Sequence, residues 1–157
     1  MAGGTRGDRA AEQLIVIGDT SALVAAFDTA HSEHESVRAA LAAASLTVVC
    51  SLVLLEIEHI VTRDFDRQTV GVLNDWLLAQ EPLGRVAVPA LPSDHLRKAR
   101  RVQDRYADLR LDLTDAVNVV LAAEYETDVI LTLDRKDFRA IRPLTGEQAF
   151  RVLPDDL

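Results

Sequence analysis

The chain has 157 residues, of which 48% are apolar, 27% are charged and one is a cysteine. This length suits one domain with its own core, and this composition excludes a disordered chain. A formal net charge of −8 and an aromatic content of 4% argue against passive binding to a polyanion and against base-stacking platforms. The single Cys50 cannot form an internal disulfide, and no secretory signal or membrane-length apolar run is recognisable, so we expect a cytoplasmic protein.

Short apolar runs alternate with amphipathic segments along the chain. Residues 1–13 lack periodicity and are expected to form a flexible tail, either native or left over from expression. We predict strands at residues 14–17, 46–50, 85–88, 129–133 and 149–152, and helices at 22–27, 32–44, 51–63, 67–80, 94–110 and 114–126. Ser32 and Glu35 match a capping box, and Asp66 is a predicted N-cap. This order predicts one α/β domain over residues 14–157, with a parallel central sheet of four to five strands flanked by helices on both faces.

Four acidic residues stand at the head or end of apolar segments: Asp19, Glu56, Asp115 and Asp134. Asp19 and Asp134 follow predicted strands, so both should project from the carboxyl edge of the sheet, where ligands bind in open parallel sheets. Carboxylates against apolar sequence are costly unless something neutralises them, and oxygen ligands suit hard cations such as Mg²⁺ and Mn²⁺. The pattern therefore predicts a divalent-metal site for phosphodiester chemistry.

Each acid also has a structural explanation. Asp115 could complement the dipole of its helix or act as the box partner of an Asp112 N-cap, and Asp134 could cap a short helix. Glu56 is hardest to explain in this way, because a carboxylate among leucines needs a partner. Four such acids expected at one edge of the sheet favour a shared functional site over four separate structural roles.

At these residues the chain resembles the PIN-domain ribonucleases, and specifically the VapC toxins of VapBC toxin–antitoxin pairs. The opening motif of the family stands at residues 19–23 (DTSAL), its helical acid at Glu56, its Asp-Ala helix start at residues 115–122 (DAVNVVLA), and its Thr-x-Asp-Arg…Phe motif at residues 132–138 (TLDRKDF). The resemblance spans residues 14 to about 153. One such motif is weak evidence, but four in order are strong evidence.

The resemblance implies a Mg²⁺- or Mn²⁺-dependent endoribonuclease that acts on structured RNA, often tRNA or rRNA. It also implies inhibition by a cognate VapB-type antitoxin and assembly into dimers or toxin–antitoxin hetero-oligomers. The active-site acids of the family carry over to Asp19, Glu56, Asp115 and Asp134, with Asp137 as a possible fifth.

The residue types suggest separate roles. We expect Asp19, Asp115 and Asp134 to bind metal, and Glu56 to bind it through water or to orient the nucleophile. Asn118 follows Asp115 by one turn and could share its face. We expect Ser21 and Thr132 to hydrogen-bond the carboxylates. If a metal ion activates water, the RNA 2′-hydroxyl is not the nucleophile, and the products carry 5′-phosphate and 3′-hydroxyl ends.

The predicted helix over residues 94–110 carries basic side chains at helical spacing, at Arg97, Arg101 and Arg105. They are candidate RNA-binding residues, although a solvated face with its own ion pairs is the simpler explanation. Trp76 is a candidate anchor for a partner helix. Two rival functions remain: a catalytically silent PIN-like module that binds RNA or protein, and a metal-dependent phosphohydrolase for small substrates.

Overall fold

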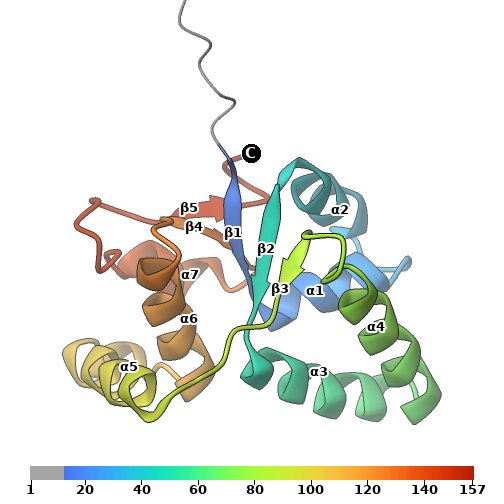
Figure 1. The fold of residues 1–157 in the computed structure, drawn as a ribbon, viewed down its shortest axis with the longest axis horizontal. Coiled ribbons are helices and arrows are strands. Elements are labelled where there is room, and N and C mark those ends of the chain that lie inside the picture. Colours follow the sequence, from blue (N-terminus) through green and yellow to red (C-terminus); the bar gives the residue numbers. More distant parts are fainter. Residues whose placement is uncertain (1–12) are drawn as a thin grey trace, which may run out of the picture.

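The centre of the structure is a parallel sheet of five short strands in the order β3-β2-β1-β4-β5 (Figure 1). This computed structural model describes residues 13–157, so all but the last residue of the predicted tail lie outside the described residues. The strands are β1 (Ile15–Gly18), β2 (Leu46–Val49), β3 (Val86–Ala87), β4 (Val129–Leu131) and β5 (Arg151–Leu153). The predicted fold class, a parallel sheet of four to five strands covered on both faces, is confirmed.

Helices cover both faces of this sheet, which explains why the strands are mostly apolar. They are α1 (Thr20–Phe27), α2 (His34–Ala43), α3 (Ser51–Asp64), α4 (Arg67–Ala79), α5 (Ser93–Arg105), α6 (Leu113–Glu124) and α7 (Arg135–Ala140), with a 3₁₀ turn at Ala107–Leu109. α1 and α2 pack on one face, α6 packs on the other, and α5 packs against α6 (Figure 1). No described helix is long and apolar enough to cross a membrane.

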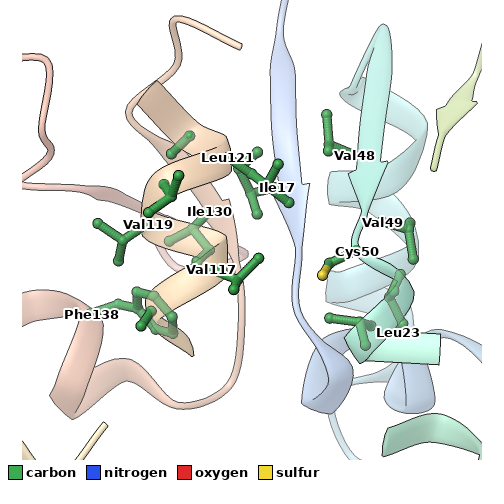
Figure 2. Packing of buried hydrophobic residues seen from close by; sticks show 14 of the residues in the cluster. Ile17, Leu23, Val48, Val49, Cys50, Val117, Val119, Leu121, Ile130 and Phe138 are labelled. Carbon is green, nitrogen blue, oxygen red and sulfur yellow. The ribbon is translucent and has the colours of Figure 1, made fainter. Parts of the chain in front are cut away.

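The alternation of side chains along β1 divides the core between these two faces. Val16 packs with the alanine-rich sides of α1 and α2, whereas Ile17 packs with α6. Figure 2 shows Ile17 beside Leu121 of α6, with Ile130 and Phe138 in the same apolar cluster. Gly18 ends the strand where a Cβ atom would lie 3.0 Å from Cγ2 of Thr47. The glycine therefore lets β1 and β2 approach closely just before Asp19.

Local signals placed some helix ends correctly. Asp66 caps α4, since its Oδ1 accepts a hydrogen bond from the Thr69 amide at 2.7 Å. Cys50 is buried at the start of α3, its Sγ accepts a hydrogen bond from the Leu52 amide, and burial raises the pKa of its thiol. Cys50 is thus a packed residue.

Two other predictions about helices are wrong. The capping box of Ser32 and Glu35 does not form: α2 begins at His34, Glu33 takes the N-cap position without a side-chain cap hydrogen bond, and its carboxylate pairs with Arg135. The helix predicted over residues 94–110 ends at Arg105, and Arg110 adopts a left-handed conformation with φ 52°. The chain turns there so that α6 can pack back against α5.

Candidate metal centre

Three of the four predicted acids meet at the carboxyl edge of the sheet. Asp19 directly follows β1, and its amide donates to the Leu131 carbonyl of β4 at 2.9 Å. Asp134 lies three residues beyond β4, and Asp115 lies in the first turn of α6. One carboxylate oxygen from each of Asp19, Asp115 and Asp134 lies within 4.8 Å of the other two. Residues separated by up to 115 positions in the chain therefore offer three oxygen ligands to one point in space.

Asp19 is the buried member of the cluster, with only 2% of its surface exposed. Its Oδ1 accepts a hydrogen bond from Asn118 Nδ2 at 3.3 Å, and its Oδ2 accepts one from Thr132 Oγ1 at 2.7 Å. Burial raises the pKa of Asp19 from 3.8 to about 6, against the opposing effect of the Thr132 hydrogen bond. The charges of Asp134 and Glu56 raise it further. A cation at this position would relieve that penalty.

Asp115 has both of the roles that the sequence allowed. Its amide donates to Oδ1 of the N-cap Asp112 at 2.8 Å, so it occupies a capped first turn. Its carboxylate nevertheless joins the cluster, and the pKa of Asp115 rises from 3.8 to about 8 through burial and then through the charges of Asp112 and Asp19. Helix capping explains the hydrogen bond of the Asp115 amide but not the position of the Asp115 carboxylate.

Asp134 precedes α7, but its side chain makes no cap hydrogen bond. Its amide donates to Thr132 Oγ1 at 3.0 Å. Desolvation raises the pKa of Asp134, although the residue is partly exposed, and the next cause is the charge of Asp137. Capping therefore does not explain why this acid is here.

Thr132 connects the two strand-end acids, because the hydroxyl that donates to Asp19 also accepts from the Asp134 amide. The prediction that Ser21 also hydrogen-bonds a carboxylate is wrong. Its hydroxyl accepts from the Leu133 amide at 3.0 Å and lies 3.4 Å from Thr132 Oγ1. Ser21 thus supports the backbone next to Asp134, one step further from the acids.

Glu56 lies beside this cluster and outside its three-oxygen set. Its Oε2 accepts a hydrogen bond from the Thr20 hydroxyl at 2.8 Å, and Thr20 is buried. The sequence predicted that Glu56 needs a partner but did not identify Thr20 as that partner. It also did not show that the charge of Asp112 influences the centre. The position of Thr20 next to Asp19 was the available signal, but a contact across 36 residues cannot be read from local pattern.

The donor set fits a hard divalent cation. It consists of carboxylate oxygens, and within residues 13–157 no histidine or cysteine joins it. The Asn118 amide contributes a second observation: its Oδ1 is fully buried and has no hydrogen-bond partner among these residues. A buried amide oxygen without a partner, on a residue that contacts one of several mutually repelling carboxylates, indicates a cation site. A hydrated cation there would neutralise the carboxylates, and its water could donate to the amide oxygen.

The predicted basic residues lie on α5, next to the helix that carries Asp115. Arg97, Arg101 and Arg105 are all exposed. α5 runs antiparallel to α6, since His95 near the start of α5 lies 3.6 Å from Glu124 at the end of α6. Arg105 is therefore at the end of α5 nearest Asp115, and Arg97 is further away.

The comparisons with known proteins agree with this arrangement. The PIN-domain family model matches residues 16–143. Ribonuclease VapC26 of Mycobacterium tuberculosis is 36% identical over 141 residues, which covers 88% of this chain and all of that protein.

Solved structures support the fold. The M. tuberculosis toxin VapC20, described as cleaving the sarcin–ricin loop, has a TM-score of 0.68 at 15% identity, over 76% of this chain and 90% of its own. VapBC2 of Rickettsia felis, solved with a promoter DNA fragment, has a TM-score of 0.62 at 16% identity, over 83% and 96%. A Klebsiella pneumoniae toxin–antitoxin complex has a TM-score of 0.58 at 18% identity, over 82% and 93%. The chain belongs to the PIN-domain family, in its VapC ribonuclease branch.

Proposed function

We propose that this protein is a Mg²⁺- or Mn²⁺-dependent endoribonuclease toxin, held inactive by a VapB-type antitoxin. The observation that carries the proposal is the convergence of Asp19, Asp115 and Asp134 within 4.8 Å at the carboxyl edge of the sheet. The intact acid set disfavours the rival module that binds without cutting, since clustered negative charge would only repel a phosphate.

In this mechanism Asp19, Asp115 and Asp134 would hold the cation or cations. A bound divalent ion would lower the pKa of water, polarise a phosphoryl oxygen and neutralise charge in the transition state. Thr132 and Asn118 orient the Asp19 carboxylate through its two oxygens. Glu56, whose carboxylate accepts a hydrogen bond from Thr20, would orient the attacking water and accept its proton. The charge of Asp137 raises the pKa of Asp134, so Asp137 adds to the negative charge of the site.

The substrate we propose is structured RNA, from tRNA or rRNA. Two similar proteins support this class: the 36% identical relative is a ribonuclease, and VapC20 is a toxin that cleaves the sarcin–ricin loop. α5 is a candidate surface for the RNA backbone, since it carries five arginines and lysines against two aspartates. Arg105 and Arg101 lie closer to the acids than Arg97 does, so we expect them to contribute more.

The antitoxin is expected to bind between α2 and α4. A groove there is lined by Phe27, Arg38, Val72 and Trp76, and the Arg38 guanidinium lies 5.7 Å from the centre of the Trp76 ring. Val72 is 53% exposed, which leaves apolar surface for a partner helix. The toxin–antitoxin complex among the structural neighbours supports such a partner. We further expect a homodimer or hetero-oligomer in the cytoplasm, where its RNA substrates are.

The test is incubation of antitoxin-free protein with total cellular RNA, tRNA and a sarcin–ricin loop oligonucleotide, with Mg²⁺ or Mn²⁺ or with chelator. Asp19→Ala is the inactive variant, and Asp75→Ala, at an exposed position on α4, is the matched control. Discrete fragments that need metal and vanish only in Asp19→Ala would establish the activity. Small phosphoesters in parallel test the phosphohydrolase alternative. Intact RNA with folded, metal-loaded protein would favour the silent module.

A further inference from the structure

The carboxylates of the candidate metal centre are held in different ways. Asp19 accepts hydrogen bonds at both of its oxygens, from Asn118 and Thr132. Across residues 13–157, by contrast, the Asp134 carboxylate accepts none, and only the amide of Asp134 is bound, to Thr132. The location of this ligand therefore depends on how the backbone is fixed where α7 begins.

Arg135 fixes that backbone from two sides. Its Nε donates to Asp155 Oδ2 at 2.6 Å, its Nη2 donates to Asp155 Oδ1 at 3.0 Å, and Nη2 also donates to Glu33. Each of the three side chains is only about one third exposed, so water screens these ion pairs less than it screens fully exposed ones. Glu33 ends the connection between α1 and α2, and Asp155 belongs to the turn after β5. The guanidinium thus joins three segments that are distant in sequence.

A second arginine on α7 makes a comparable ion pair without this connection. Arg139, one turn further on, donates to both oxygens of Asp156 at 2.6 and 2.8 Å. It holds α7 to the same C-terminal turn, but it has no bond to the α1–α2 connection and is not adjacent to Asp134. Phe138 between them is buried and packs edge-on against Phe150, which secures the body of the helix.

We propose that Arg135 is a positioning residue: through Glu33 and Asp155 it fixes the start of α7 and so holds the Asp134 carboxylate in reach of Asp19 and Asp115. The proposal rests on the proposed function in so far as these three acids bind a divalent cation. Arg135 acts through Asp134 and not on RNA, because two carboxylates already match its single charge. Bidentate geometry of this kind restrains position as well as supplying energy.

The test is Mn²⁺ binding, measured by the electron paramagnetic resonance signal of free Mn²⁺, for wild type, Arg135→Ala and Arg139→Ala. We expect Arg135→Ala to weaken Mn²⁺ binding about tenfold, the lower end of the range for residues that orient metal ligands, and Arg139→Ala to change it less than about twofold. RNA cleavage by Arg135→Ala should need about tenfold more Mg²⁺, with kcat restored at saturation. Equal Mn²⁺ affinities in the two variants, with similar losses of Tm, would overturn the proposal.

A second variant keeps the proposal testable if Arg135→Ala does not fold. Glu33→Gln combined with Asp155→Asn retains the arginine but removes both carboxylates, and should weaken Mn²⁺ binding to the same extent. Since the Mn²⁺ measurement uses no RNA, it separates the two claims. If wild type binds Mn²⁺ but cuts no RNA, the proposed ribonuclease activity is refuted. The Mn²⁺ affinities of the variants would still decide the role of Arg135. Wild type that binds no Mn²⁺ would refute both.

Discussion

Replacing Asp19 by asparagine should stabilise the metal-free protein while abolishing its metal response. The buried carboxylate has its pKa raised from 3.8 to about 6, chiefly by burial. At ~1.4 kcal/mol per pKa unit, this corresponds to about 3 kcal/mol of lost stability once the pH is well above 6. Asparagine has one acceptor oxygen where the carboxylate has two, so it cannot accept from both Thr132 and Asn118, and the lost hydrogen bond costs about 1 kcal/mol.

The net gain is thus about 2 kcal/mol, or roughly 4–8 °C in Tm for a domain of this size. Its pH dependence has a definite sign. A folded-state pKa above the unfolded one means that the folded state binds the proton more tightly, so wild-type stability falls as the pH rises through about 4 to 6. The advantage of Asp19→Asn should therefore be present at pH 8 and largely absent at pH 4.5.

The assay is thermal unfolding of both proteins at pH 4.5 and pH 8, in chelator and in Mg²⁺, with Asp75→Asn as the control for removing an exposed carboxylate. In Mg²⁺ at pH 8 the Tm of wild type should rise to match or exceed that of Asp19→Asn, because only wild type gains stability from binding the ion. A lower Tm for Asp19→Asn than for wild type at pH 8 in chelator would refute the reasoning. It would mean that hydrogen bonds to the carboxylate outweigh the cost of burying its charge.

Four further outcomes are expected. Glu56→Gln should reduce cleavage at saturating Mg²⁺ by about 100-fold and leave Mn²⁺ affinity within about threefold, as measured by single-turnover kinetics and Mn²⁺ titration; equal loss of both would make Glu56 a ligand. Arg101→Glu should weaken RNA binding and lower the magnitude of its salt slope by about 1 or more, whereas an unchanged slope would leave α5 a solvated face. Trp76→Ala should weaken antitoxin binding by about 2 kcal/mol in calorimetry with cleavage unchanged. End-labelling should find 5′-phosphates and 3′-hydroxyls, and a cyclic 2′,3′-phosphate would contradict metal-activated water.

The sequence predicted those features that depend on neighbouring residues. The run at residues 14–17 indicated a strand with both faces buried, and β1 is indeed the middle strand. Asp66 and Asp112 each bond an amide three residues ahead, so their caps depend only on local geometry. The strand-end location of Asp19 and Asp134 followed from the rule that parallel strands present their carboxyl ends at one edge.

The features that were missed depend on contacts between distant segments. Ser32 had a suitable partner at the right spacing, but Glu33 pairs with Arg135, 102 residues away, and α2 starts later. The apolar periodicity continued to Leu109, yet the helix stops at Arg105, and the Tyr106 hydroxyl accepts a hydrogen bond from the Arg142 amide. No local pattern contains the partner in either case.

The net charge of −8 and an RNA substrate are compatible because the charges are distributed unevenly. At an ionic strength of ~0.15 M the Debye length is about 8 Å, so a phosphate near Asp19 responds to its immediate surroundings and not to the whole chain. Those surroundings contain carboxylates whose pKa values are raised first by burial and then by one another's charge, and a divalent ion would neutralise most of that charge. The excess of basic residues is on α5, which packs against the helix that carries Asp115. RNA affinity should consequently depend on metal more steeply than net charge would suggest, since the same ion completes the active site and reduces its repulsion of phosphate.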